Sequence, residues 1–162
     1  MSVRIYVPST LSMLAEVVVS GGVGPVPVLA HAVTEAVRAG YPGAGEEEWE
    51  YAAMSAAAQD SLALLTEEDV PRRVVIALDT SAVLPVEAAE ESLVEVHEVM
   101  PAADIAAVHV DSADAEADVS AARGAWLDAQ NGDAQAVKTV ERCLDHELGW
   151  FATQEIGDLL EE

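Results

Sequence analysis

Cysteine and aromatic residues are scarce in this chain of 162 residues. Its one cysteine, Cys143, excludes an internal disulfide and a zinc site made of cysteines alone. A single cysteine also fits a reducing compartment. Aromatic residues make up only 4% of the sequence, so the core has to be built mainly from Ala, Val and Leu. A chain of this length buries enough surface to fold without a metal or a disulfide, and we expect no cofactor.

Positive charge is scarce as well. The sequence holds 7 Lys and Arg residues against 30 Asp and Glu residues, which gives a formal net charge of -23. The cations are scattered along the chain: Arg4, Arg38, Arg72, Arg73, Arg123, Lys138 and Arg142. Nucleic acids and anionic lipid surfaces attract clustered cations, so we expect no direct binding of nucleic acid or of a membrane.

Long apolar runs are missing too. No run is long enough to cross a bilayer, and residues 1–8 lack the basic and apolar regions of a signal peptide. We therefore expect a cytoplasmic protein. Its acidity fits two functions, docking to a basic partner or mimicry of a nucleic acid, besides a plain contribution to solubility.

The pattern of apolar residues predicts the elements of the first half. Apolar and polar residues alternate over residues 3–7, which indicates a strand. Ser9 or Thr10 can cap a helix that runs to about Ser20, and residues 28–33 indicate a second strand. A long helix begins at the acidic residues 46–48, and its expected core stripe consists of Tyr51, Met54, Ala58, Leu62 and Leu65.

The second half predicts further strands and helices. Residues 74–78 are continuously apolar, which is typical of a central strand covered on both faces. A helix should follow Asp111 or Ser112, and Asp133 can cap a last helix that extends to Leu160. We expect a single globular α+β domain over residues 1–162, with a mixed sheet of about five strands packed with about four to five helices.

A β-hairpin is the firmest strand pairing that the sequence predicts. Residues 93–100 and 104–110 indicate two strands with a short connection between them. Such a hairpin would bring His97 and His109 onto one face together with Glu95. Imidazoles and a carboxylate can hold a metal ion, but a shift of one residue in register would separate the two histidines. We therefore expect no metal site and keep these residues as weak candidates.

The predicted C-terminal helix carries the main candidate for a binding site. His146, Trp150 and Gln154 are spaced by four residues, so a helix would align them as a polar and aromatic strip, with Glu147 at its edge. Glu155 would fall on the apolar stripe, where a carboxylate is costly unless it is paired or the helix ends. A second packing face or a dimer seam is the alternative interpretation of the strip.

Four segments together resemble a known family. They are residues 6–11 (YVPSTL), 31–34 (HAVT), 106–111 (AAVHVD) and 145–155 (DHELGWFATQE). They are similar to an uncharacterised family of small acidic proteins from actinobacteria, a domain of unknown function, over nearly the whole chain. The resemblance implies a cytoplasmic bacterial protein and carries over no catalytic residue.

The sequence contains no complete catalytic set. The glycine-rich segment 21–24 lacks the lysine of a phosphate-binding loop, and Trp150 replaces the second histidine of the zinc-protease pattern H-E-x-x-H. We therefore expect a non-catalytic protein that binds another protein, with a homodimer as one form of this binding. The alternatives are a small enzyme or ligand-binding domain with a pocket near the C-terminal helix, and an acidic mimic of a nucleic acid.

Overall fold

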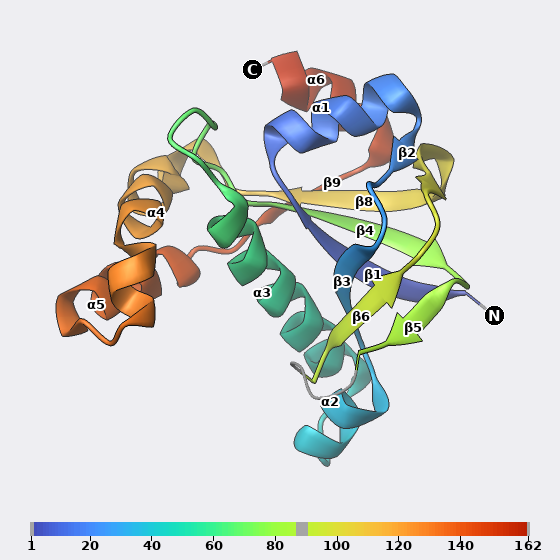
Figure 1. Cartoon of the computed structure of the whole chain (residues 1–162), viewed down its shortest axis with the longest axis horizontal. Helices are drawn as coiled ribbons and strands as arrows, with labels where there is room; N and C mark the ends of the chain where they lie inside the picture. The colour runs from blue at the N-terminus through green and yellow to red at the C-terminus, as the bar shows by residue number, and fades with distance from the viewer. Residues whose placement is uncertain (1, 87–90, 162) are drawn as a thin grey trace.

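The computed structural model describes residues 2–86 and 91–161. They form an α+β fold around a seven-stranded sheet in the order β5-β6-β3-β1-β4-β8-β9, beside a two-stranded sheet, β2-β7 (Figure 1). The strands are β1 (Val3–Ser9), β2 (Gly22–Val23), β3 (Val28–Ala32), β4 (Val74–Thr80), β5 (Val83–Pro85), β6 (Leu93–Val96), β7 (Met100–Pro101), β8 (Ile105–Val110) and β9 (Gly149–Phe151). Neighbouring strands of the described chain pair antiparallel.

The described residues also form six α-helices. They are α1 (Leu11–Ser20), α2 (Glu35–Gly40), α3 (Glu46–Leu64), α4 (Glu116–Gln130), α5 (Ala134–Leu144) and α6 (Ile156–Glu161). Local signals mark the starts of α1 and α5 as predicted. The hydroxyl of Thr10 accepts a hydrogen bond from the backbone N–H of Met13, and Asp133 caps α5 in the same way. Gly21 ends α1 with a φ of 81°, a conformation that glycine adopts without steric cost.

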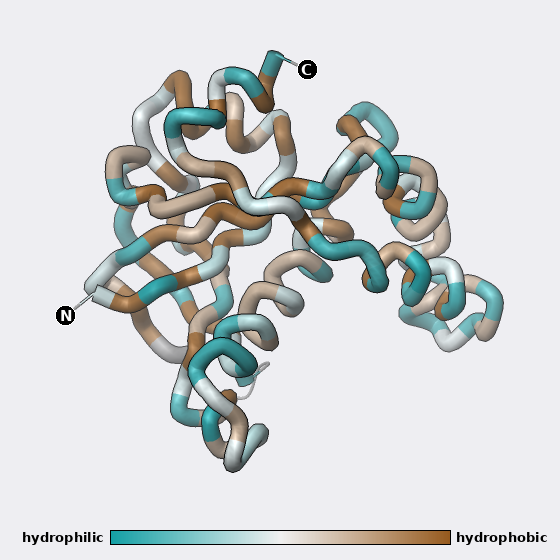
Figure 2. Tube along the Cα trace, turned by 180° about the vertical axis from the view of Figure 1, so that it is seen from behind, coloured by the Kyte–Doolittle hydropathy of each residue, from teal (hydrophilic) through white to brown (hydrophobic). Residues whose placement is uncertain are grey.

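The central strand β4 divides the core into two faces. Val74, Ile76 and Leu78 pack in a cluster with residues of α1 and α6, whereas Val75 and Ala77 pack against α3. All five side chains are at most 1% exposed, which confirms a central strand covered on both faces. Figure 1 shows α1 and α6 side by side, and Figure 2 shows apolar strands crossing the middle of the molecule with hydrophilic segments at its rim.

The helix α3 approaches the sheet through small side chains. Ala53 and Ala57 are fully buried against Tyr6, and alanine allows the two backbones to come close. The predicted core stripe of this helix holds at its C-terminal end, where Leu62 is buried. It fails at the N-terminal end, because Tyr51 is 57% exposed. A third cluster joins the end of α3 to α4 and α5.

Two predictions about the sheet are wrong. It has seven strands in antiparallel pairing where a mixed sheet of about five was expected, and the predicted hairpin does not form. β6 pairs with β3 and β5, whereas β8 pairs with β4 and β9. The segment between β6 and β8 explains why no hairpin forms. Within it, β7 pairs with β2 outside the main sheet, and the chain returns to the main sheet on the far side of β3, β1 and β4.

In the described part of the chain, no helix has both the length and the apolar character needed to span a bilayer.

Candidate functional site

The C-terminal segment does not continue as one helix. The helix α5 ends at Leu144, and after a turn the chain adds β9 to the edge of the sheet beside β8. Arg73 fixes this turn, because its Nη2 donates a hydrogen bond to the carbonyl oxygen of His146 at 2.9 Å. The prediction that His146, Trp150 and Gln154 share one helix face is therefore wrong.

Three of the predicted residues nevertheless meet in one place. His146, Glu147 and Trp150 line a cleft of about 820 Å³ between α3 and the segment that follows α5. We call this the aromatic cleft, after the exposed aromatic side chains that line it, Tyr41, Tyr51 and Trp150. Its side chains used below are Glu48, Tyr51, His109, His146, Glu147 and Trp150.

Trp150 stands next to His109 on the sheet. The register places His109 opposite Trp150 on one side and opposite Val75 on the other. Residues directly opposite one another share a face, and the packing of Val75 shows that this is the face covered by α3. Trp150 is 63% exposed, so the indole forms an open wall that the described residues leave uncovered.

The imidazole of His109 is an unpaired polar group among the described residues of the cleft. It is half-buried, and within the described chain it has no hydrogen-bonding partner, whereas each of the other three histidines has at least one. Burial lowers the pKa of His109 and the charge of Arg4 lowers it further, so the ring is neutral at pH 7. A neutral imidazole offers a ligand one donor and one acceptor.

A buried ion pair supports the inner end of the cleft. Arg73 donates from Nε and Nη2 to the two carboxylate oxygens of Asp111, both at 2.8 Å, and its backbone N–H donates to the same carboxylate at 2.8 Å. The side chains are 2% and 0% exposed. Burial alone lowers the pKa of Arg73, but the hydrogen bonds and charge of Asp111 outweigh it and raise this pKa above its usual value. The cleft therefore has a rigid and locally neutralised floor.

The remaining charges of the cleft are negative. His146 is held by Asp118 of α4, with 2.7 Å between Nε2 and Oδ2. Glu48 and Glu147 line the cleft and have no ion-pair partner among the described residues. The cleft thus combines aromatic faces with unpaired carboxylates, a set that suits a cation.

The last two residues of the predicted strip lie outside the cleft. Gln154 and Glu155 are exposed and belong to the short 3-10 turn before α6. The carboxylate of Glu155 accepts a hydrogen bond from the backbone N–H of Ala152 at 2.7 Å. Glu155 avoids the cost of burial because the helix has already ended, the second of the two outcomes expected for it.

His97 and His109 do not come together. His97 follows β6 and His109 lies in β8, and three strands separate the two in the sheet. At about 4.8 Å per strand, this places them roughly 19 Å apart, too far to hold one ion. His97 instead lies 3.4 Å from the carboxylate of Glu95. Among the described residues, no three His, Cys, Asp or Glu side chains are grouped closely enough to hold a metal.

Sequence reasoning missed a serine, histidine and aspartate set. The ring of His31 lies 2.7 Å from Ser92 Oγ through Nδ1 and 2.6 Å from Asp60 Oδ2 through Nε2. His31 is 0% exposed and Ser92 is 6% exposed, and Ser92 lines neither the aromatic cleft nor a larger cavity between α1 and α3. A nucleophile has to be reachable by its substrate. The set therefore connects β3, α3 and the start of β6 as a buried polar link.

Cys143 is a core residue. It packs fully buried between α3, α4 and α5, and burial raises the pKa of its thiol to about 11. A thiol with such a pKa is a poor nucleophile at neutral pH.

Comparison with known proteins places the chain in a family without revealing an activity. No curated protein and no solved structure matches it. A family of unknown function (DUF6912) matches residues 3–160, which is nearly the whole chain. This confirms the expected relationship to a domain of unknown function. The protein belongs to the DUF6912 family.

Proposed function

We propose that this protein is a non-catalytic binding protein whose aromatic cleft receives a lysine or arginine side chain from a basic segment of another protein. One observation carries the proposal. Trp150 and Tyr51, exposed by 63% and 57%, line the same cleft as two carboxylates that have no ion-pair partner among the described residues.

The chemistry of the cleft favours a cation. Aromatic faces attract ammonium and guanidinium groups by roughly 0.5–2 kcal/mol, more when water is excluded. Glu48 and Glu147 add charge attraction at the same cavity. The cations already present do not oppose this, because Arg73 is neutralised by Asp111 and His109 is neutral.

The surroundings of the cleft favour a protein segment as the source of the cation. β9 is the last strand of the sheet, so its outer edge can offer backbone groups to an extended chain. The net charge of -23 accelerates the approach of a basic partner over a longer range. Two copies of this chain would repel one another for the same reason, and we therefore propose a basic partner before a homodimer.

We also propose that the protein is located in the cytoplasm. The one cysteine of the chain is a free buried thiol, which suits a reducing compartment. Six arginines against one lysine, with many alanines and valines, suit an actinobacterial source with GC-rich genes. Fractionation of the native cells would test the location directly.

Calorimetric titration with the peptide acetyl-(Arg-Ser)4-amide tests the proposal. We expect Trp150→Ala and Tyr51→Ala each to weaken binding roughly tenfold, as for central aromatic residues of an interface. Leu127→Ala is the matched control, because Leu127 is a 75% exposed apolar residue of α4 outside the cleft. Glu147→Gln should weaken binding more than Glu67→Gln, an equal loss of charge elsewhere on the surface.

Two results would contradict the proposal. One is that the cleft variants and the control variants bind the peptide equally well, which would mean that only the overall charge attracts it. The other is a concentration-dependent dimer in sedimentation that Trp150→Ala abolishes, which would make a second copy of this chain the occupant of the cleft.

A further inference from the structure

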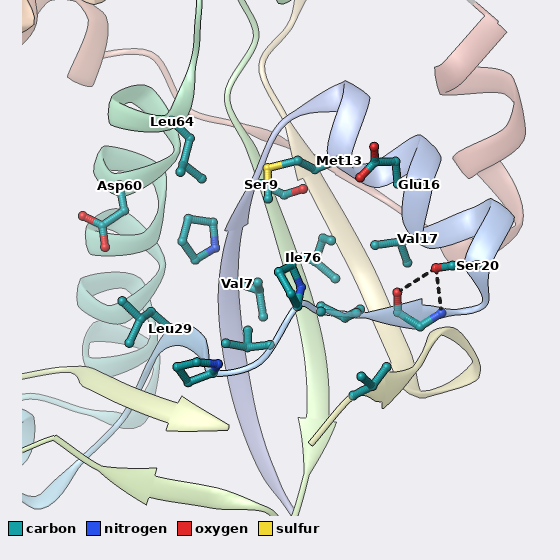
Figure 3. Close-up of a pocket in the computed structure, with 18 of the residues that line it drawn as sticks. Val7, Ser9, Met13, Glu16, Val17, Ser20, Leu29, Asp60, Leu64 and Ile76 are labelled. Carbon is teal, nitrogen blue, oxygen red and sulfur yellow. Dashed lines mark hydrogen bonds between the residues drawn. The ribbon is translucent and has the colours of Figure 1, made fainter. Parts of the chain in front are cut away.

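A second and larger cavity lies elsewhere in the molecule. It has a volume of about 1160 Å³ and opens where β3 diverges from β1. β1 pairs with β4 along its whole length, but with β3 only at Ile5 and Tyr6. Beyond Tyr6, Pro8 has no N–H with which to extend the ladder. Figure 3 shows the cavity between the C-terminal half of α3, which carries Asp60 and Leu64, and α1, which carries Glu16 and Val17.

The walls of this cavity are mostly apolar. Exposed apolar side chains line the cavity. They include Val19, Leu29, Leu64 and Val99, which are between 43% and 89% exposed. Its serines are already engaged, since Ser9 donates to a backbone carbonyl and Ser20 bonds to Gly22. A cavity of this size with apolar walls and few polar groups is typical of a site for a small molecule.

The charged groups at the cavity have one sign. Asp60 and Glu16 line it, and none of the described lining residues is a lysine, arginine or histidine. The buried ring of His31 holds the carboxylate of Asp60 in place. An ionised carboxylate only accepts hydrogen bonds, so Nε2 of His31 donates its proton to Asp60 Oδ2, while Nδ1 faces Ser92. Asp60 keeps Oδ1 without a partner among the described residues, and its side chain is 41% exposed.

We propose that this cavity binds an apolar molecule that carries an amine or ammonium group. The apolar walls take the hydrocarbon part, Asp60 takes the cationic head, and Glu16 adds negative charge from the opposite wall (Figure 3). A fatty acid fits the walls equally well, but its carboxylate would face two carboxylates in a chain of charge -23. The site is separate from the aromatic cleft, because the two cavities share no described residue.

Titration of the natural protein with short-chain amphiphiles tests both parts of the proposal. Octylamine, decylamine and dodecylamine, used below their micelle concentrations, should bind one per chain. Their affinity should rise roughly fourfold for each added methylene, the value for transfer of a CH₂ group out of water. At equal chain length the amine should bind better than the alcohol, and the alcohol better than the carboxylate. An affinity that does not depend on chain length, or a carboxylate that matches the amine, overturns the proposal.

Matched variants locate the site. Ala63 lines the cavity from an exposed position of α3, so Ala63→Trp should fill the cavity and abolish binding. Ala121→Trp, at an exposed position of α4, should leave binding unchanged. Asp60→Asn should weaken the amine about tenfold and leave the alcohol unchanged, which a general collapse of the cavity would not do. Full binding by a folded Ala63→Trp variant, or an equal loss of amine and alcohol in Asp60→Asn, contradicts the assignment. If Ala63→Trp does not fold, the chain-length series and the order of head groups decide.

Discussion

Removal of the buried carboxylate of Asp111 should destabilise the protein far more than removal of a similar exposed one. In Asp111→Ala the guanidinium of Arg73 stays buried but loses both charge-assisted hydrogen bonds, and the backbone N–H of Arg73 loses its acceptor. Breaking a buried pair on one side costs about 3–5 kcal/mol, which is a large share of the roughly 5–15 kcal/mol that stabilises a typical domain.

The chain contains its own control for this experiment. Arg4 and Asp79 form a second two-pronged pair, with distances of 2.7 and 3.3 Å, between neighbouring strands. Its side chains are 42% and 45% exposed, so water screens the interaction. Asp79→Ala should therefore cost less than about 1 kcal/mol.

Thermal and urea unfolding of the two variants measure the difference. For a chain of this size, Asp111→Ala should lower the melting temperature by roughly 6–20 °C, and Asp79→Ala by at most about 4 °C. The double replacement Arg73→Met with Asp111→Leu should recover much of the loss, because no buried charge is left. Equal destabilisation by Asp111→Ala and Asp79→Ala would refute this account of the pair.

Two further predictions follow from the direction of pKa shifts. NMR titration should give His109 a pKa below 6.5 in the folded protein. Because the fold favours the neutral ring, the stability that His109 contributes is complete above pH 6.5 and is lost as the pH falls towards the pKa of the folded state. His109→Gln should lessen the fall in stability below pH 6.5, and a pKa at or above 6.5 would contradict the described environment. Cys143 should react with a disulfide reagent at pH 8 roughly 200 times more slowly in the folded than in the unfolded chain, and equal rates would show that the thiol is not buried.

The sequence predicts those helix ends and strand faces that depend only on residues close to them in the chain. The continuous apolar run of β4 is buried on both faces, and Thr10 and Asp133 mark the starts of helices as expected. Each of these features depends on contacts within a few positions of the chain. These features can therefore be predicted without knowledge of the fold.

Long-range contacts decide what the sequence could not show. Leu148 and Phe151 continue the apolar spacing of α5, but Arg73 bonds to the carbonyl of His146 and β9 joins β8, so the helix stops. Periodicity could not distinguish these alternatives because both bury the two apolar residues in part. The side-chain chemistry of His146, Glu147 and Trp150 predicts that they share a site, but the continuous helix expected to align them is wrong.

The buried set of His31, Asp60 and Ser92 had no sequence signal. Its members are 29 and 61 positions apart, and only the strand order brings them together. The residue type of His109 suggests a metal ligand, but its position next to Trp150 depends on the pairing of β8 with β9. Strand order in an antiparallel sheet depends on the whole core and is not contained in any one segment.

An NMR titration with acetyl-(Arg-Ser)4-amide tests the proposed function most directly. The indole N–H of Trp150 reports on the cleft, while that of Trp126, which packs in the third cluster and does not line the cleft, reports on a distant part of the protein. We predict that the Trp150 indole and the backbone signals of residues 144–150 shift with one common saturation curve while the Trp126 indole stays in place. Small shifts spread evenly over the acidic surface, without saturation at Trp150, would contradict the proposed function.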